Sequence, residues 1–357
     1  MYARWYQEDP AHWGIVSVSR NNNSLIFDLT IFHSLAKSSG DFAFPEGAIF
    51  AICGKTTAFG RVYIAHEGIN AQMSVPEQNF SDFVTLLNTY QEFKGVDIKV
   101  AVEDDGKSFY KLAIKVRNKI VADGINDSSF NPADTGEYLT SQKFNDYLES
   151  TDTIVVDMRN HYESEVGRFK NAYCPDADTF REELVQSLEF LTGQEDKNII
   201  MYCTGGIRCE KASSYFKHKG FKNVYSLKGG IIQYANDVKK YNLENKFIGK
   251  NFVFDERVGE RITDDIIANC HQCDKPSDRH MNCRNDDCHL LFIQCEMCEQ
   301  AMSGCCTLRC QQIAALPIEE QRKLRKNRYK SPTETLSVYK SRLRPNLRDL
   351  IKERVEN

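Results

Sequence analysis

The clearest pattern of apolar and polar positions lies in the middle of the chain, where short apolar runs alternate with amphipathic stretches. The apolar runs predict buried strands over residues 153–157, 199–202 and 223–227. The amphipathic stretches predict helices over residues 141–148 (with Thr140 as N-cap), 160–166, 179–191, 209–216 and 231–239. Strands that alternate with helices predict a parallel sheet with helices on both of its faces.

A second pattern predicts a smaller α+β unit over residues 47–122. Its expected strands cover residues 48–52, 61–65, 69–75, 96–102 and 110–116, and the second and third form a hairpin around the polar turn His66–Asn70. We expect a helix from Pro76 to about Thr89, because its large apolar residues fall on one stripe. Strands and helices in this order fit a ferredoxin-like sandwich. Further expectations are an edge strand over 13–18 and turns at 21–24 and 104–106.

Shifts in composition divide the chain into five parts. We expect a ferredoxin-like α+β domain over 1–123, a linker rich in Asn, Asp, Ser and Pro over 124–137, the parallel-sheet domain over 138–247, a cysteine-rich segment over 248–315 and a basic helical tail over 316–357.

The overall composition narrows the class of protein. No run of 18 apolar residues occurs among the 357 residues, and the first residues lack the apolar core of a secretory signal. We therefore expect a cytoplasmic protein without a membrane partner, in a compartment where thiols stay reduced. In such a compartment, 13 cysteines favour metal binding or catalysis over disulfides.

The net charge of −4 conceals a basic C-terminal tail. Residues 321–357 hold 12 Lys and Arg against 4 Asp and Glu, a net charge of +8, so residues 1–320 carry −12. The expected helices over 321–330 and 340–354 show little apolar periodicity. Such a tail either contacts the phosphates of a nucleic acid or is simply a solvated terminus. Charge alone does not distinguish these alternatives.

The best candidate for chemistry is the short loop that begins at Cys203, between the expected strand at 199–202 and the next helix. Its sulfur would lie above backbone N–H groups, from Thr204 to Cys209, and close to a helix N-terminus. Both features favour the thiolate, so we expect a lowered pKa. The alternative is a buried cysteine before a glycine turn, but strand, glycines, arginine and helix together favour function.

Other residues of this loop and its neighbourhood have expected roles. Gly205 and Gly206 permit the turn, Ile207 completes it, and Arg208 holds an anion or pairs with Asp157.

Asp157, Arg159, Cys203 and Leu227 follow or end strands, so they meet at one edge of a parallel sheet, where such sheets bind ligands. For Arg159 and Glu163, a structural salt bridge and a substrate contact both stay open.

Two residues of the helix after the loop carry open alternatives. Cys209 resolves an oxidised Cys203 or simply packs in the helix, the second being the simpler interpretation. Lys211, one turn along, meets a phosphate or water.

Nine cysteines between residues 270 and 310 indicate a metal-binding segment. Cys-x2-Cys pairs place two sulfurs within reach of one tetrahedral ion. Alternating use of the pairs puts Cys270, Cys273, Cys295 and Cys298 on one ion and Cys283, Cys288, Cys306 and Cys310 on a second, leaving Cys305 over. His271, His280 and His289 are possible substitutes. Two structural zinc ions fit best, since no coordination position is left for water, whereas free or disulfide cysteines are the alternative.

Several motifs together resemble a known superfamily. Asp157-Met158-Arg159, Gly167-Arg168-Phe169, the Cys203 loop and Leu227-Lys228-Gly229-Gly230 resemble a rhodanese domain. The Cys-x4-Arg spacing is that of the sulfurtransferases, whereas the phosphatase loop, Cys-x5-Arg, is one residue longer because it wraps a phosphate.

Three longer motifs narrow the resemblance to one family. They are Gly60–Asn70, Met201–Ala212 and Phe252–Arg257, and they resemble the rhodanese-like, oxygen-dependent tRNA uridine hydroxylases over roughly residues 47–310. This resemblance implies conversion of uridine 34 of tRNA to 5-hydroxyuridine, with O2 as co-substrate, tRNA as the partner, no DNA partner, and Cys203 as the essential thiol.

Two chemical routes remain open at the sequence level. Cys203 adds to C6 of uridine and makes C5 electron-rich, or it acts as a persulfide or another oxidised form. No flavin motif, haem motif or 2-His-1-carboxylate set is evident, so the electron donor is not identified.

Two other functions compete with hydroxylation. A plain sulfurtransferase would use a Cys203 persulfide but needs neither the N-terminal domain nor the cysteine-rich segment. A non-catalytic adaptor would not need an intact loop.

Overall fold

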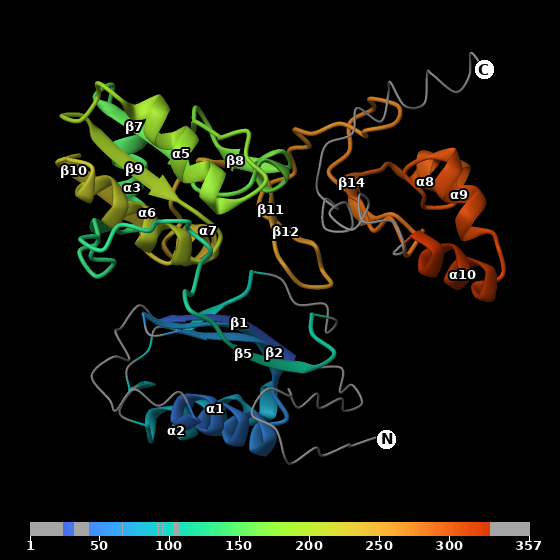
Figure 1. Cartoon of the computed structure of the whole chain (residues 1–357). Coiled ribbons are helices and arrows are strands. Elements are labelled where there is room, and N and C mark those ends of the chain that lie inside the picture. Colours follow the sequence, from blue (N-terminus) through green and yellow to red (C-terminus); the bar gives the residue numbers. More distant parts are fainter. Residues whose placement is uncertain are drawn as a thin grey trace. The chain divides into compact units, whose positions relative to one another are not determined.

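The structure is a computed structural model that describes residues 24–31, 43–65, 67–90, 93, 94, 96, 98–102 and 108–328 (Figure 1). Its contacts divide the chain into two compact units. The first contains the chain up to Ser164 with residues 169–247 and 251–262, and the second contains residues 165–168, 248–250 and those from Thr263 onward. No helix of the described residues is long and apolar enough to cross a membrane.

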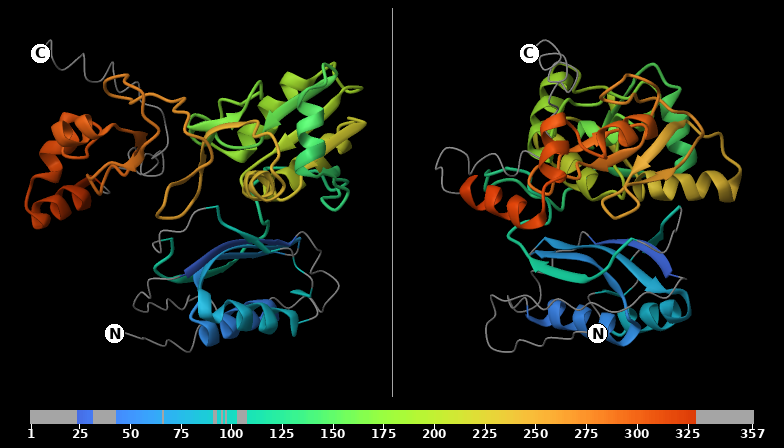
Figure 2. Two further views of the ribbon diagram at one scale, coloured as in Figure 1. Left: turned by 180° about the vertical axis from the view of Figure 1, so that it is seen from behind. Right: turned by 90° about the vertical axis from the view of Figure 1, so that its right-hand side faces the viewer.

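The N-terminal domain is a five-stranded sheet with two helices on one face (Figure 2). Its elements are β1 (Ser24–Ile31), α1 (Ala43–Thr56), β2 (Phe59–Ala65), β3 (Gly68–Pro76), α2 (Glu77–Asn88), β4 (Ile98–Val100) and β5 (Leu112–Val116). The strand order is β4-β1-β3-β2-β5, with β5 parallel to β2 and the other neighbours antiparallel. The first four strands have the order of a ferredoxin-like sandwich, as predicted.

The strand expected at 48–52 is wrong, because these residues belong to α1. Ile49, Ile52 and Cys53 are buried in the domain core at helical spacing, and a short apolar run cannot by itself distinguish the two structures. The strand expected at 96–102 shortens to β4, and β1 was not foreseen. The predictions at 13–18, 21–23, His66 and 104–106 lie outside the described residues.

The central domain is a parallel sheet, as predicted. Its elements are β6 (Glu137–Leu139), α3 (Ser141–Leu148), β7 (Thr153–Asp157), α4 (His161–Ser164), β8 (Gly167–Phe169), α5 (Phe180–Leu191), β9 (Asn198–Tyr202), α6 (Ile207–His218), β10 (Asn223–Leu227) and α7 (Gly230–Tyr241). The strand order is β6-β10-β9-β7 and every pair is parallel.

Alternating residues of β9 build the two cores of this domain. Ile199 and Met201 pack in a cluster with α5 and α6, whereas Ile200 and Tyr202 pack in a cluster with α3 and α7. Helices therefore cover both faces, and the carboxyl end of β9 is held from both sides.

The expected linker packs along α6. Residues 117–136 contain no helix or strand. The Gly136 N–H donates to Ser213 Oγ at 2.9 Å, and Ser214 Oγ donates to the Asn131 carbonyl at 3.2 Å.

The C-terminal segments are short. They comprise β11 (Phe247–Phe252), β12 (Gly259–Arg261), β13 (His280–Asn282), β14 (Leu291–Ile293), α8 (Glu296–Met302), α9 (Leu308–Ala314) and α10 (Ile318–Arg328). The strands β12, β11 and β8 form one sheet, and β13 pairs with β14. Cysteines supply most of the buried core around α9.

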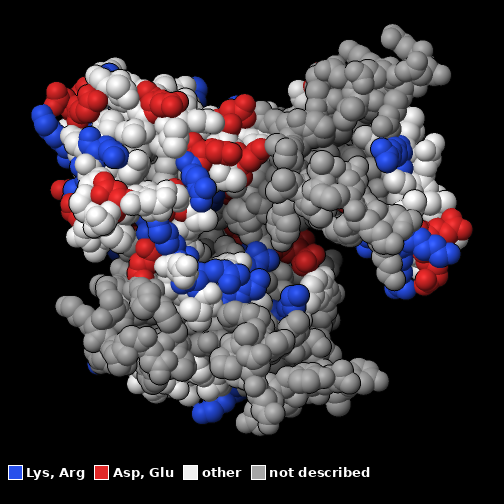
Figure 3. All heavy atoms as spheres, viewed as in Figure 1, with Lys and Arg blue, Asp and Glu red and all other residues white. Residues whose placement is uncertain are grey.

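The first part of the basic tail is the exposed helix α10, which carries both signs of charge. Glu319 and Glu320 lie in its first turn, and Arg322 pairs with Glu319. In Figure 3, acidic and basic side chains lie side by side at this end of the chain. Residues 329–357, with the second expected helix, lie outside the described residues.

Candidate functional site

The Cys203 loop lies between β9 and α6, where it was expected. Gly206 precedes α6 with φ of 106°, a left-handed conformation that favours glycine. This turn aims the Gly206 N–H at Cys203 Sγ, with a nitrogen–sulfur distance of 3.1 Å.

The start of α7 supports the loop from a second direction. The Ile231 N–H donates to the Cys203 carbonyl at 3.0 Å, and the Ile232 N–H donates to the Thr204 carbonyl at 3.2 Å. A Cβ on Gly230 would lie 2.5 Å from both of these carbonyl oxygens, so only glycine permits this approach. Gly230, the second glycine after β10, therefore lets α7 hold the Cys203 loop in place.

The surroundings of Cys203 favour its thiolate. Its side chain is fully buried, and burial alone would raise the pKa of the thiol. The hydrogen bond from the Cys209 thiol, the charge of Arg208 and the N–H groups of Cys209 and Gly206 outweigh burial and lower the pKa of Cys203 to about 5. At neutral pH the resting form is therefore the thiolate, which is the nucleophilic form.

Cys209 is the donor in this pair. Burial, the hydrogen bond to Cys203 and its negative charge raise the pKa of Cys209 well above its usual range. The two neighbouring cysteines thus divide into one thiolate and one thiol.

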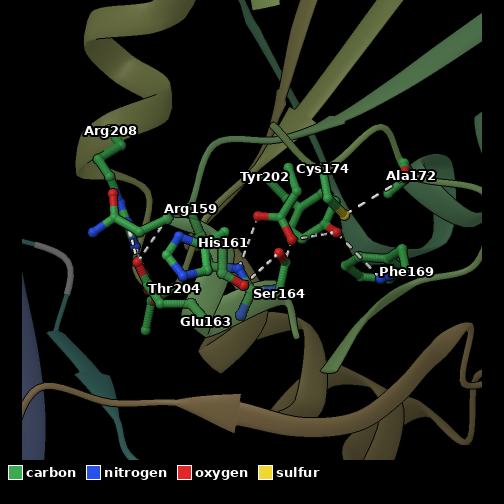
Figure 4. A network of polar contacts seen from close by, with 12 residues as sticks. Arg159, His161, Glu163, Ser164, Phe169, Ala172, Cys174, Tyr202, Thr204 and Arg208 are labelled. Carbon is green, nitrogen blue, oxygen red and sulfur yellow. Dashed lines mark hydrogen bonds and ion pairs between the residues drawn. The ribbon is translucent and has the colours of Figure 1, made fainter. Parts of the chain in front are cut away.

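Arg208 pairs with Glu163, and the pairing expected with Asp157 is wrong. Figure 4 shows the fork of Arg208 on the carboxylate of Glu163, with distances of 2.5 Å from Nη1 to Oε2 and 2.9 Å from Nη2 to Oε1. Thr204 Oγ1 lies 3.3 Å from both Glu163 Oε1 and Arg208 Nη2. Glu163 comes from α4, so this short helix fixes the guanidinium beside the nucleophile.

Asp157 has a different partner. Its carboxylate accepts from Arg159 Nε at 2.8 Å, from Arg159 Nη2 at 2.7 Å and from the Tyr202 hydroxyl at 2.7 Å. All three side chains are fully buried. Of the two alternatives for Arg159, the geometry favours the structural salt bridge, which ties β7 to β9.

Lys211, expected to meet a phosphate or water, is instead buried in an ion pair. Its ammonium group is buried, with 1% of the residue exposed, and pairs with Glu67 at the β2–β3 turn and with Asp123 at 3.2 Å. The ion pair explains why a lysine occupies a buried position on α6.

Glu183 is a buried acid that the sequence interpretation missed. It lies on the apolar face of α5 with Phe180 and Leu184, and neither carboxylate oxygen has a hydrogen-bond partner among the described residues. Burial raises its pKa well above the usual range, so the acid is held neutral. Its position on an apolar helical stripe was the signal that could have found it.

Eight cysteines of the second unit form the two predicted groups. In each group the four sulfurs lie within 4.8 Å of one another: Cys270, Cys273, Cys295 and Cys298, and then Cys283, Cys288, Cys306 and Cys310. Backbone N–H groups point at two sulfurs, Cys295 N at Cys270 Sγ and Cys306 N at Cys283 Sγ, both at 3.4 Å.

The remaining cysteine and the histidines stand outside these groups. Cys305 is buried and belongs to neither group, as predicted, and neither group contains His271, His280 or His289. His271 instead lies 2.9 Å from Glu165 through Nε2.

Three known domain families match consecutive parts of the chain. Residues 42–120 match the UPF0176 acylphosphatase-like domain, residues 140–237 the rhodanese-like domain, and residues 248–311 the family described as Rhodanase C-terminal.

Relatives match across these domains. A tRNA uridine(34) hydroxylase of Yersinia pestis (strain Pestoides F) is 56% identical over 275 residues, which cover 77% of this chain and 78% of the relative. The chain belongs to the tRNA uridine(34) hydroxylase family. A member from Pectobacterium atrosepticum is 57% identical over 271 residues, covering 76% of each chain. The family predicted from the sequence motifs is therefore confirmed, as are the ferredoxin-like and rhodanese-like domains.

Proposed function

We propose that this protein hydroxylates uridine 34 of tRNA to 5-hydroxyuridine, with O2 as co-substrate and Cys203 as the essential thiolate. The observation that carries the proposal is a buried cysteine with a pKa of about 5 at the carboxyl end of a parallel sheet, in a chain 56% identical to proteins named tRNA uridine(34) hydroxylase. Because tRNA is the substrate, we also place the protein in the cytoplasm.

Cys203 has the properties of a nucleophile for C6 of uridine. Addition of the thiolate to C6 makes C5 electron-rich and thus reactive toward an oxygen donor. The Cys209 thiol and the Gly206 N–H hold the negative charge on sulfur before addition and receive it again on elimination. One atom of O2 enters the base and the other leaves as water, a step that takes two electrons from a cellular reductant and two protons.

Arg208, Glu163 and Thr204 orient the loop. The bidentate pair between Arg208 and Glu163 is buried, so it fixes the position of the guanidinium and water does not compete for it. We propose that Arg208 stabilises the sulfur anion and that Glu163 positions Arg208.

We further propose that each group of four cysteines holds one structural zinc ion. Four thiolates at this spacing fit tetrahedral coordination and leave no open position for water. Few apolar residues are available in this segment, so the bound ions would supply much of its folding free energy. Zinc here would organise the fold and take no part in the reaction at Cys203.

Nucleoside mass spectrometry of tRNA tests the proposed function. Cells that lack the protein receive the wild type, Cys203→Ala or Cys174→Ala. Cys174 is the matched control, because it is a partly buried cysteine of the same domain. We expect 5-hydroxyuridine with the wild type and Cys174→Ala and none with Cys203→Ala.

The alternative outcomes separate the competing functions. Identical tRNA in all strains would contradict hydroxylation and favour the sulfurtransferase, which predicts rapid sulfur transfer from thiosulfate to cyanide through Cys203. Full rescue by Cys203→Ala would retain the activity but overturn the role of the thiolate.

A further inference from the structure

The turn that follows β11 is built more rigidly than a surface connection requires. Its backbone is closed by hydrogen bonds from Val258 N to the Asp255 carbonyl at 3.0 Å and from Val253 N to the Val258 carbonyl at 3.4 Å. Val258 has φ of 61°, a left-handed conformation that is costly for a β-branched residue. Other contacts must therefore hold the turn in this shape.

A charged cluster provides those contacts. Arg257 donates to Asp255 from Nε at 2.9 Å and from Nη2 at 2.5 Å, and to Glu260 from Nη1 at 2.5 Å. Glu260 is fully buried and also accepts from Val102 N at 3.1 Å. Because charge-assisted hydrogen bonds are strong when buried, this cluster fixes the residues between β11 and β12.

The fixed turn presents Phe254 to the Cys203 loop. The Arg208 guanidinium carbon lies 5.8 Å from the centre of the Phe254 ring. Phe252 makes an edge-to-face contact with this ring, with ring centroids 5.2 Å apart, and another with Tyr162 at 5.3 Å. Phe252 and Tyr162 are buried, whereas Phe254 keeps part of its surface exposed. Of these three rings, Phe254 is the one that keeps exposed surface.

An RNA base that reacts must leave its stack, and proteins commonly replace that stack with an aromatic side chain. Uracil is uncharged, and the charges of Arg208 in the Cys203 loop and of Glu163 are already paired with each other. We propose that Phe254 is the surface on which the uracil ring of the substrate stacks beside Cys203. This inference rests on the function proposed above and adds a substrate-contacting residue to it.

The first test uses the base as a quencher. In full-length Phe254→Trp, we expect an anticodon stem-loop RNA with uridine at the wobble position to quench the fluorescence of Trp at 254. The wild-type protein, with its two native tryptophans, gives the background to subtract. The same RNA with an abasic wobble nucleotide should bind but quench little. Equal quenching by both RNAs would overturn the proposal.

The second test measures 5-hydroxyuridine in complemented cells. Phe254→Leu keeps an apolar side chain but loses the ring, and we expect a reduction in hydroxylation of about tenfold, in line with the strength of base–aromatic stacking. Phe254→Trp should retain activity. Tyr241→Leu is the matched control, because Tyr241 is an aromatic residue of α7 that is 59% exposed and lies outside the site.

A thiolate titration separates stacking from a purely structural role. If Phe254 acts only by positioning Arg208, Phe254→Leu will raise the pKa of Cys203, and that result would overturn the stacking proposal. Stacking predicts an unchanged Cys203 titration with lowered hydroxylation. If the wild type itself makes no 5-hydroxyuridine, the proposed function fails, while the quenching experiment still decides whether a base stacks at position 254.

Discussion

The hydrogen bond from Cys209 to Cys203 gives the sharpest prediction about the nucleophile. Substituting Cys209 by Ala removes a buried thiol that donates to the Cys203 thiolate and leaves the other partners of the sulfur in place. A hydrogen bond to a charged group contributes about 1.5–3 kcal/mol, and each 1.4 kcal/mol changes a pKa by about one. The pKa of Cys203 should therefore rise from about 5 to roughly 6–7.

Ultraviolet absorbance of the thiolate measures this change directly. Titration curves of the wild type and Cys209→Ala are each corrected by subtracting the same protein with Cys203→Ala. Cys209→Ser is the matched control, because its hydroxyl keeps a donor at the same position, and we expect its Cys203 pKa to stay close to the wild-type value. A Cys203 pKa that does not rise in Cys209→Ala would refute the argument that this thiol stabilises the anion.

Three further predictions concern stability and metal content. Glu163→Gln leaves the buried Arg208 charge without its partner, so we expect a loss of about 3–5 kcal/mol in the free energy of unfolding, measured by urea denaturation. Glu183→Met should stabilise the protein at neutral pH but much less near pH 4: the raised pKa of Glu183 means that folding opposes ionisation, a cost that appears only above the carboxyl's unfolded pKa of about 4.5. An equal effect at both pH values would contradict this reasoning. Elemental analysis should find two zinc ions per chain, one after Cys270→Ser and two after Cys305→Ser, and a loss caused by Cys305→Ser would show that the cysteines are assigned wrongly.

Most of the architecture could be predicted because the spacing of apolar residues and the helix-capping residues agree with the fold. Thr140 caps α3, Thr179 forms a capping box at α5, and the runs that became β7, β9 and β10 are short and bounded by polar residues. The helix α1 was missed because its apolar positions are dense enough to resemble a buried strand. The domain boundaries stay predictions.

The nucleophile of the site could be predicted from the sequence, but the residues that pair with Arg208 and Lys211 could not. Spacing within one loop places Cys203, Gly206 and Arg208 together, because those residues are neighbours in sequence. Which carboxylate pairs with Arg208 depends on where the short helix α4 lies in the fold, and the spacing of residues in the sequence does not give that position. The burial of Lys211 likewise depends on Glu67, which is 144 residues away along the chain.

We propose that O2 supplies the oxygen atom that Cys203 chemistry inserts into uridine. The most direct measurement is mass spectrometry of tRNA nucleosides from complemented cells grown under oxygen gas enriched in the heavy isotope. We expect the label in 5-hydroxyuridine from cells with the wild type and no such nucleoside from cells with Cys203→Ala. Formation of 5-hydroxyuridine without the label would show that its oxygen comes from water and would contradict the account.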